Sequence, residues 1–495
     1  MTGEPFEKFP NLEEDMTENR PSQLWQQAQA GLQKFWGYDR FRPLQGEIAT
    51  SLLQHRDALV MLPTGAGKSL CFQLPALLQE GLTLVVSPLV ALMEDQVRAL
   101  EARHGAATLL HSEQSRGQRQ KTLQMLENGQ VKLLYLSPES LLSVNLWQRL
   151  TPLSQRVQTL VIDEAHCIAQ WGSHFRPVYR RLGTVRPGLL QHRSPTDRIA
   201  IAAFTATADA ATQQDIRNVL GLKQPQVFRS SPYRKNLSLQ IVRVWTPAAR
   251  RDRLQQFVRA RGQTTGLVYT RSRRDSEQLV EWLQQQGLRA AAYHAGLAPQ
   301  LRRQIEQQWL SGELPFVICT SAFGMGVDKS NVRWVCHFHP PLTLAEYLQE
   351  IGRAGRDGVA SQTLLIASEP TGLLDPTDRQ RREGFLRQMR SQAQLAQTLA
   401  KQLPKEGYLP DVLKQEPQAE LALAILQTQG QLVWIDPFNY RFQPKAAAMS
   451  QAEPQASVEA YLSERGCRWR FLLDAFGFGR EAQGLRCGHC DRCQP

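Results

Sequence analysis

Short apolar runs alternate with segments of helical periodicity through most of the chain, and they form two series separated near residue 230. Continuous apolar runs rich in β-branched residues, with helices between them, are typical of parallel strands covered on both faces. The pattern predicts an α/β protein with two parallel sheets in tandem, whose functional residues follow the carboxyl ends of the strands. The runs cover residues 58–62, 82–86, 131–136, 159–162 and 199–204, then 267–269, 290–293, 316–319, 334–338 and 363–366.

The last quarter of the chain has a different pattern. A basic, Gln-rich helical segment at 375–403 precedes two short helical patterns and an apolar hairpin pattern around Asp436-Pro437. Two helices and a hairpin resemble a trimmed winged helix, which indicates either a pin that separates strands or a small structural insertion. The predicted regions are a disordered acidic tail (1–20), two α/β domains (21–230 and 231–370), a helical region with the helix–hairpin unit (371–456) and a cysteine-containing module (457–495).

Size and composition limit the class of protein. A chain of 495 residues is too long for one hydrophobic core. It has no apolar run of about 18 residues and no signal-peptide pattern, and four of its eight cysteines lie singly in apolar segments, so we expect a cytoplasmic protein. The net charge of +12 becomes +16 without the acidic tail, which favours a polyanionic partner.

A glycine-rich turn lies between the first apolar run and a helical segment. Such a turn aims backbone N–H groups and the helix dipole at an anion, and glycine lets the backbone approach a phosphate closely. Lys68 would reach the β- and γ-phosphates of a nucleotide, and the Ser69 hydroxyl would bind Mg²⁺. An ordinary strand-to-helix turn is the alternative, which the rest of the chain disfavours. The residues expected to bind ATP and Mg²⁺ here are Thr64, Gly65, Ala66, Gly67, Lys68 and Ser69.

Two clusters accompany this turn. Upstream, Tyr38, Arg42 and Gln45 suit stacking on a purine and hydrogen bonding to it, although a packed helix cap is the alternative. Downstream, the run 159–162 ends in Asp163 and Glu164. A carboxylate pair after a strand suits a metal–nucleotide site, because Asp163 can bind Mg²⁺ and Glu164 can orient or deprotonate the attacking water.

Aromatic and basic residues gather at two further places. Trp171, Phe175 and Arg176 follow the acidic pair, and this interleaving indicates base stacking, with a buried aromatic mini-core as the alternative. In the second α/β block, Arg353 and Arg356 lie three residues apart within a Gly-Arg repeat. A neighbouring domain that brings arginine to the γ-phosphate is the arginine-finger arrangement, for which the forked guanidinium is well suited.

These motifs, in this order, resemble superfamily 2 helicases and, more narrowly, the RecQ family of DNA helicases. The resemblance covers about residues 35–358 and resumes at the C-terminal cysteines. It implies two stacked RecA-like folds with ATP in the cleft between them. It also implies that Tyr38, Arg42 and Gln45 hold adenine and that Asp328 reaches the ribose.

The resemblance further assigns catalytic and DNA-binding positions. The aromatic-rich loop departs from the family at Ser173-His174, where most members carry His-Asp. The expected catalytic residues are Lys68, Asp163, Glu164, Gln349, Arg353 and Arg356. The expected DNA contacts are Ser87, Pro138, Trp171, Phe175, Arg176, Arg271 and His294.

The last four cysteines have metal-ligand spacing. Cys467 is followed after nineteen residues by Cys487, and Cys490 and Cys493 follow at CxxC intervals. Four thiolates form a closed tetrahedral zinc site, which is structural because no position is left for water. A redox CxxC is the disfavoured alternative. The pattern resembles the RecQ zinc-binding module, although here the helix–hairpin unit precedes the cysteines instead of following them.

The sequence therefore predicts a RecQ-type ATP-dependent DNA helicase. We expect it to move 3′→5′ on single-stranded DNA, to unwind duplex or forked DNA in repair and recombination, and to use ATP, Mg²⁺ and structural Zn²⁺. It would act as a nucleoid-associated monomer, with a single-strand-binding protein as a further partner. The alternatives are a DNA-stimulated translocase or annealing factor without strand separation, and a zinc-stapled nucleic-acid-binding scaffold. An RNA helicase is disfavoured by the zinc module and the aromatic-rich loop.

Overall fold

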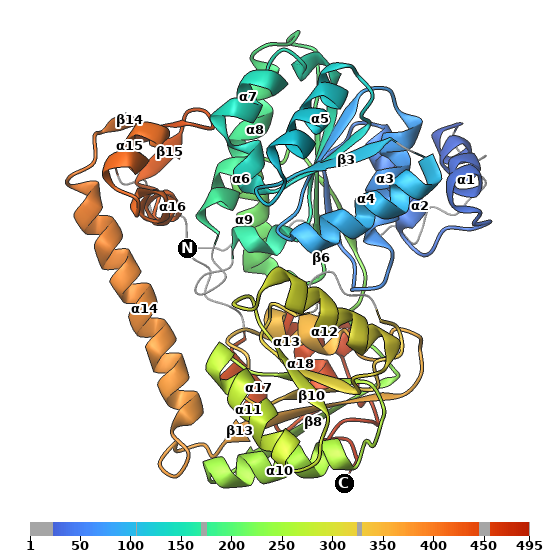
Figure 1. The fold of residues 1–495 in the computed structure, drawn as a ribbon, viewed down its shortest axis with the longest axis vertical. Coiled ribbons are helices and arrows are strands. Elements are labelled where there is room, and N and C mark those ends of the chain that lie inside the picture. Colours follow the sequence, from blue (N-terminus) through green and yellow to red (C-terminus); the bar gives the residue numbers. More distant parts are fainter. Residues whose placement is uncertain (1–22, 105, 170–175, 324–328, 445–455, 495) are drawn as a thin grey trace, which may run out of the picture.

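Two parallel sheets form two domains stacked one above the other (Figure 1), as the sequence pattern predicts. The computed structural model describes residues 23–104, 106–169, 176–323, 329–444 and 456–494. The predicted acidic tail and three predicted site residues, Trp171, Phe175 and Asp328, lie outside this part. Among the helices it describes, none is both long and apolar enough to cross a membrane.

Domain 1 is built on a seven-stranded, all-parallel sheet with the order β3-β4-β2-β5-β6-β1-β7. Its central strands are buried along their whole length, because helices cover both faces of the sheet. The strands are β1 (Ala58–Met61), β2 (Leu82–Val86), β3 (Ala107–Leu110), β4 (Leu133–Leu136), β5 (Val157–Ile162), β6 (Ala200–Thr205) and β7 (Gln226–Arg229). The helices are α1 (Gln23–Trp36), α2 (Gln45–Leu53), α3 (Lys68–Leu78), α4 (Val90–His104), α5 (Arg116–Glu127), α6 (Pro138–Leu141), α7 (Val144–Leu150), η1 (Ser154–Arg156), η2 (Ala165–Ile168), η3 (Pro177–Thr184), α8 (Val185–Leu190) and α9 (Ala210–Leu220).

Domain 2 repeats the plan with a six-stranded parallel sheet in the order β10-β11-β9-β12-β13-β8. The strands are β8 (Leu237–Val244), β9 (Gly266–Tyr269), β10 (Ala290–Tyr293), β11 (Phe316–Cys319), β12 (Trp334–His337) and β13 (Ser361–Ser368). The helices are α10 (Pro247–Arg259), α11 (Arg273–Gln285), α12 (Pro299–Ser311) and α13 (Leu344–Ile351).

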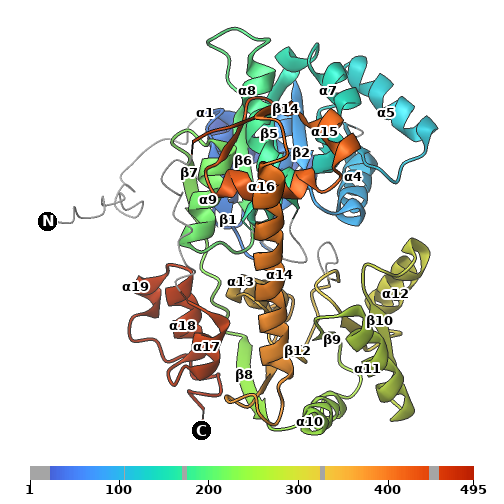
Figure 2. The same ribbon diagram turned by 90° about the vertical axis from the view of Figure 1, so that its left-hand side faces the viewer.

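A long helix, α14 (Thr377–Ala400), leaves domain 2 and runs along the outside of the molecule to a small unit beside domain 1 (Figures 1 and 2). We call residues 406–442 the C-terminal unit. Its two helices and hairpin match the predicted pattern, and a third strand completes an antiparallel sheet in the order β14-β16-β15. The unit contains β14 (Glu406–Tyr408), α15 (Leu409–Gln415), α16 (Ala419–Thr428), β15 (Leu432–Trp434) and β16 (Asn439–Phe442).

The cysteine module packs on the exposed side of β8, the edge strand of domain 2 (Figure 2). Its helices are α17 (Val458–Ser463), α18 (Arg468–Ala475) and α19 (Gly479–Ala482). The fully buried Trp469 donates its indole N–H to the Leu237 carbonyl at 3.1 Å, and the Asp491 N–H bonds to the Leu239 carbonyl at 2.9 Å. The module and domain 2 share one hydrophobic core, so the module protects an edge that would otherwise be open to pairing.

Candidate active site

The glycine-rich turn connects β1 to α3 and has the geometry of an anion-binding loop. Gly65 and Gly67 have φ angles of +85° and +78°, which only glycine adopts readily. Gly67 is the N-cap of α3, so the free N–H groups of this helix begin in the turn. A Cβ on Gly67 would collide with the amide nitrogen of Gln45, so the second glycine is also needed for close packing.

The three predicted adenine-binding residues lie beside this loop. Gln45 donates from Nε2 to the Ala66 carbonyl at 2.9 Å, and Arg42 donates from Nη1 to the Gly65 carbonyl at 2.8 Å. The Gln45 Oε1 accepts the Arg42 backbone N–H at 3.0 Å. Tyr38 is more exposed, with 55% of its surface accessible. The pair Arg42 and Gln45 therefore braces the loop, and its contact with adenine stays a prediction.

The acidic pair follows β5 and faces the same loop. Lys68 Nζ lies 3.6 Å from Glu164 Oε1, and His166 Nδ1 lies 3.2 Å from Glu164 Oε2. His166 Nδ1 is also 3.1 Å from the Thr205 hydroxyl at the end of β6. Glu164 has a φ of +49°, a left-handed conformation that is costly for a residue with a Cβ. The chain therefore turns sharply to present this carboxylate to the lysine.

Burial and charge give the two carboxyls different acidities. Burial, together with the Glu164 charge, raises the pKa of Asp163 to about 6. Burial also opposes ionisation of Glu164, but Lys68 and His166 outweigh it and hold the Glu164 pKa below its ordinary value. Burial lowers the pKa of His166, whereas contacts with Cys167 and Glu164 raise it to about 10. Glu164 is thus an anion held between two cations, as a group that accepts a proton from water requires.

Domain 2 brings its arginine motif to the same loop. A Cβ built on Gly65 would lie 3.4 Å from Arg356 Cδ, and one built on Gly352 would lie 3.8 Å from the Thr64 hydroxyl. Arg353 is 5% exposed, and its charge helps to lower the pKa of Glu164 across the domain boundary. Gln349 lies half-buried near the end of α13, just before this motif. The predicted arginine pair therefore faces the cleft from the second domain.

Glu350 supports this motif and was not among the predicted site residues. Its carboxylate accepts two hydrogen bonds from Arg271, at 3.1 and 2.7 Å, and lies 2.7 Å from His337 Nε2. Arg271 and His337 outweigh the effect of burial and lower the pKa of Glu350 to about 2. Its place between Gln349 and Arg353 was the available signal, because an acid within an arginine-rich motif needs a partner.

The four predicted metal ligands come together. Each of Cys467, Cys487, Cys490 and Cys493 offers a sulfur, and these sulfurs all lie within 4.8 Å of one another. A zinc ion with Zn–S bonds of about 2.3 Å spaces four tetrahedral sulfurs about 3.8 Å apart, so the cluster fits the ion. All eight cysteines are free thiols. The redox alternative therefore has no support from a disulfide here.

Comparison with known proteins follows the same division. The DEAD/DEAH box helicase model matches residues 42–216, and the helicase conserved C-terminal domain model matches residues 249–358. The chain is 48% identical to the ATP-dependent DNA helicase RecQ of Synechocystis, over 94% of this chain and 98% of that protein. This chain belongs to the RecQ family. Its sites are thus those of an ATP hydrolase that couples hydrolysis to DNA strand separation.

Other relatives differ in how much of their length the chain covers. It is 36% identical to the probable ATP-dependent DNA helicase RecS of Bacillus subtilis, over 94% of this chain and 91% of that one. It is 42% identical to RecQ of Haemophilus influenzae, over 68% of this chain but only 52% of that one. Among solved structures, Mycobacterium smegmatis Lhr bound to ssDNA and AMP-PNP shares the fold, with a TM-score of 0.55 and 22% identity over 86% of this chain and 60% of that one. MrfA bound to DNA has a TM-score of 0.57 and 20% identity, covering 85% and 62% of the two chains.

The predicted DNA contacts of this RecQ protein lie near the carboxyl ends of the two sheets. Ser87 and Pro138 follow β2 and β4 and are buried, and the Ser87 hydroxyl has no hydrogen-bond partner in the described part of the chain. Arg176 is half-buried, 3.7 Å from Glu139. Arg271 is occupied by Glu350, and His294 is buried with Nε2 3.0 Å from Glu277. The ion pairs of Arg271 and His294 indicate supporting positions, and direct DNA contact by all five stays a prediction.

Proposed function

We propose that this RecQ-family chain translocates 3′→5′ along single-stranded DNA and unwinds duplex or forked DNA in repair and recombination. The observation that carries the proposal is the meeting of two catalytic sets across the cleft. Lys68 and Glu164 come from domain 1, and Arg353 and Arg356 approach from domain 2. ATP would bridge the two domains, and hydrolysis would remove the bridge, so the cleft would alternate between closed and open.

The residues present fit ATP and Mg²⁺. Lys68 Nζ is buried and has no hydrogen-bond partner among the described residues, although Glu164 is nearby. A phosphate at the N-terminus of α3 would satisfy this ammonium group. Ser69 and Asp163 would hold Mg²⁺, which neutralises phosphate charge when it is bound. Glu164 would accept the proton of the attacking water, and Arg353 and Arg356 would stabilise charge on the transferred phosphoryl group.

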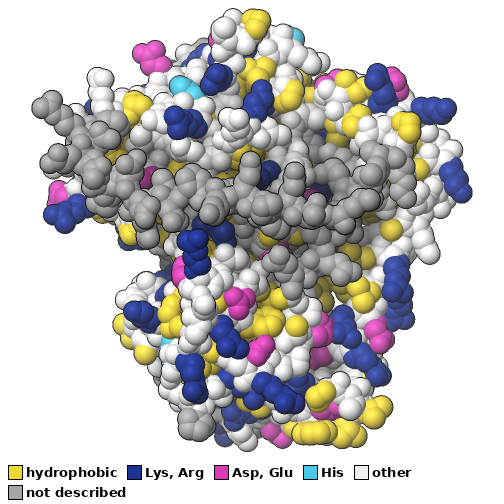
Figure 3. Space-filling model, turned by 180° about the vertical axis from the view of Figure 1, so that it is seen from behind, with side chains coloured by type: hydrophobic (Ala, Val, Ile, Leu, Met, Phe, Trp, Pro, Cys, Tyr) yellow, Lys and Arg dark blue, Asp and Glu magenta, His cyan; other side chains and the backbone are white. Residues whose placement is uncertain are grey.

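The proposed substrate is DNA, contacted through its backbone at the carboxyl ends of both sheets. Lysine and arginine side chains are spread over both halves of the face in Figure 3, as a protein that follows a polyanion requires. Contacts of this kind carry little sequence information. We further propose a monomer that acts at the nucleoid in the cytoplasm, with single-strand-binding protein as a partner and with Zn²⁺ held by the four cysteines.

A strand-displacement assay tests the proposal. The substrates are duplexes with a 3′ or a 5′ single-stranded tail, incubated with and without ATP, and Lys68→Ala is the inactive control. Opening of only the 3′-tailed duplex, dependent on ATP and lost in the variant, is expected. Opening of only the 5′-tailed duplex would reverse the proposed direction. ATP turnover by Lys68→Ala equal to that of the wild type would show that the phosphate site is elsewhere.

A second candidate is a DNA-stimulated translocase that does not separate strands. One observation favours it: the hairpin of the C-terminal unit does not project freely, because Pro437 at its turn accepts a hydrogen bond from Arg181 of domain 1 at 3.0 Å. A strand-separating pin needs a free tip. DNA-stimulated ATP turnover without displacement of either tailed duplex would support this candidate.

A further inference from the structure

The C-terminal unit is joined to domain 1 through one buried arginine of η3. Arg181 donates from Nη1 to the Pro437 carbonyl at 3.0 Å and from Nη2 to Glu420 Oε1 at 2.5 Å. Its guanidinium also lies over the Trp434 ring, 5.5 Å from the centroid. Arg181 is only 6% exposed, so these contacts use nearly all of its polar capacity. A desolvated, charge-assisted contact of this kind is stronger than a surface ion pair.

Neighbouring contacts extend this interface. Phe438 meets Trp147 of α7 edge to face, with ring centroids 6.1 Å apart. A Cβ on Gly188 of α8 would lie 3.5 Å from Pro437 Cδ, and Gln427 Nε2 donates to the Arg180 carbonyl at 3.4 Å. The hairpin turn is therefore packed against domain 1, which corrects the expectation of a free pin.

The charge of the C-terminal unit argues against a direct role in binding DNA. Residues 406–442 contain five acidic and only two basic residues, in a chain whose net charge is +12. A surface that binds the phosphate backbone needs the opposite balance. The unit is better suited to hold domain 1 than to hold nucleic acid.

From Arg181 a short series of contacts leads to the catalytic centre. The adjacent Arg180 is 2% exposed and donates from Nη1 to the Ile168 carbonyl at 3.1 Å, which joins η3 to η2. Turn η2 begins at Ala165 and carries His166, which contacts Glu164 at 3.2 Å. The position of η3 thus bears on the position of the catalytic carboxylate.

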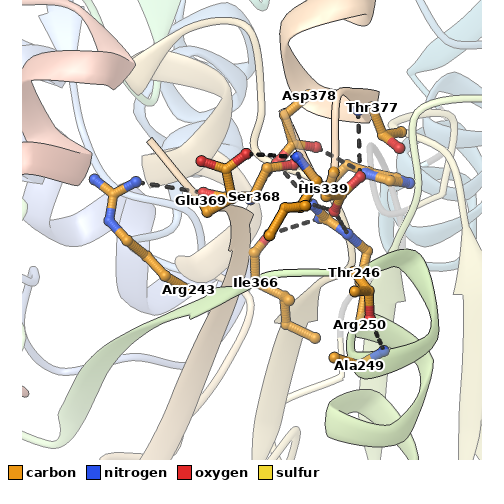
Figure 4. A network of polar contacts seen from close by, with 12 residues as sticks. Arg243, Thr246, Ala249, Arg250, His339, Ile366, Ser368, Glu369, Thr377 and Asp378 are labelled. Atoms are coloured by element: carbon orange, nitrogen blue, oxygen red, sulfur yellow. Dashed lines mark hydrogen bonds and ion pairs between the residues drawn. The ribbon is translucent and has the colours of Figure 1, made fainter. Parts of the chain in front are cut away.

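At its other end, the unit is connected to domain 2 through α14. Arg250 of α10 is almost fully buried where β13 meets the start of α14 (Figure 4). It donates from Nη2 to Ser368 Oγ at 2.7 Å, to Asp375 at 2.8 Å and to Asp378 at 2.9 Å. His339 lies 2.9 Å from the other oxygen of Asp378. This anchor makes α14 move with domain 2, so any movement between the domains acts on the Arg181 contact.

We propose that Arg181 is a positioning residue, through which the C-terminal unit makes ATP hydrolysis respond to DNA. The inference rests on the proposed function, because it concerns DNA-stimulated turnover. DNA that bridges the two domains changes their relative position, α14 transmits the change to the unit, and Arg181 transmits it to η3, η2 and Glu164. Loss of the contact uncouples hydrolysis from DNA without altering the groups that touch ATP.

A charge-swap experiment tests the contact. ATP turnover is measured with and without a saturating single-stranded oligonucleotide for the wild type, Arg181→Glu, Glu420→Arg and the double variant. Each single variant is expected to lower the ratio of stimulated to basal turnover by about 2- to 30-fold, the usual range for a coupling contact. Basal turnover is expected to stay unchanged, and the double variant should recover most of the ratio. The matched control is Arg441→Glu, because Arg441 pairs with Glu406 inside the unit and both side chains are more than half exposed.

The outcomes separate the two ideas. A wild type that DNA does not stimulate would refute the proposed function and this inference with it. A stimulated wild type with equally stimulated single variants would refute the inference alone, as would single variants that the second substitution does not rescue. Thermal melting checks the fold of each variant. If Arg181→Glu does not fold, Arg181→Gln and Trp434→Ala replace it, and stimulation equal to that of the wild type in both would overturn the inference.

Discussion

At the scale of single residues, Glu164 has the most constrained environment in the candidate active site. It combines a left-handed backbone with contacts to Lys68 and His166, and these cations keep its carboxyl ionised. Strained residues persist where the surroundings determine them and where function requires their position. The strain at Glu164 is therefore consistent with a catalytic role for this carboxylate.

The role of Glu164 can be tested with an isosteric amide. We expect Glu164→Gln to lower DNA-stimulated kcat by about 10²- to 10⁴-fold, because an amide cannot accept the proton of the attacking water. Nucleotide binding should persist, since Lys68 and the loop remain. Turnover and binding of a fluorescent ATP analogue are measured side by side, with Glu127→Gln as the control, because Glu127 lies in an exposed ion pair with Arg149. Turnover at the control level would remove Glu164 from the mechanism.

The anchor of α14 gives stability a specific pH dependence. Burial lowers the pKa of His339 from 6.5 to about 4, so the unfolded chain binds a proton on this side chain at pH values where the folded chain does not. Stability therefore falls as the pH decreases through the window from 6.5 to 4. Between pH 7 and pH 5 this one side chain should cost the folded state about 2 kcal/mol.

Urea unfolding at pH 7 and pH 5 measures this effect. The comparison is between the wild type and His339→Gln, which keeps a hydrogen-bond donor for Asp378 but does not titrate. We expect the wild type to lose more stability than the variant between the two pH values. Equal losses would show that His339 is as readily protonated in the folded chain as in the unfolded one.

At the scale of elements, the sequence pattern located the central strands and missed those at the edges. Strands β1, β2, β4, β5 and β6 are buried on both faces, so each reads as a continuous apolar run. Edge strand β7 is half-exposed and was taken as the start of a linker, and β8 alternates because the cysteine module covers it. Edge strand β3, Ala107–Leu110, was also missed.

The candidate site was predictable where chemistry requires fixed spacing along the chain. The phosphate-binding loop, the acidic pair and the four cysteines each come from one short segment or carry a metal-ligand pattern. Pairings between distant segments were not predictable. Arg271 with Glu350, and Arg181 with Glu420, join residues 79 and 239 positions apart. Which partner an arginine finds depends on the fold, and the sequence alone gave no sign that Arg271 would be occupied.

The cysteine module leads to a prediction at this scale. We expect Cys490→Ser to lose bound zinc and to unfold the module, because structural zinc supplies folding energy. Since the module shares a core with domain 2 and covers β8, domain 2 should also melt at a lower temperature. Zinc content and calorimetric melting are compared with Cys71→Ser, which alters a buried cysteine of α3 in domain 1. A zinc-free protein with unchanged melting would contradict the four-cysteine site.

At the scale of the whole molecule, the two α/β domains are connected in two ways. Their motifs meet across the ATP cleft, and α14 with the C-terminal unit forms a second, outer link (Figures 1 and 2). Between its anchors, α14 is exposed on most sides, and its residues are mainly polar, as expected for a helix that crosses solvent between domains. The helix contains five arginines and two acids. Three of the arginines form ion pairs with Glu383, Asp275 and Glu459.

The remaining two, Arg387 and Arg390, are exposed and form no ion pair with another described residue. Because they are held away from both domains by a helix anchored at each end, they can meet a phosphate backbone at little conformational cost. We expect Arg387→Gln with Arg390→Gln to weaken DNA binding. The slope of log K against log[salt] should become shallower by up to about 0.9 per lost contact on duplex and about 0.7 on single strands.

Fluorescence anisotropy without ATP measures this loss on single-stranded, duplex and forked DNA at several salt concentrations. The matched control is Arg116→Gln with Arg119→Gln, which removes two arginines of the same spacing from α5, at the outer edge of domain 1 (Figure 2). Since the assay needs no hydrolysis, its result is independent of the Arg181 contact. A loss confined to the duplex and the fork would place α14 beside the duplex ahead of the separating strands, whereas a loss confined to single strands would place it on the exit path. Slopes equal to those of the control on every substrate would mean that these arginines serve only to keep a bridging helix in solvent.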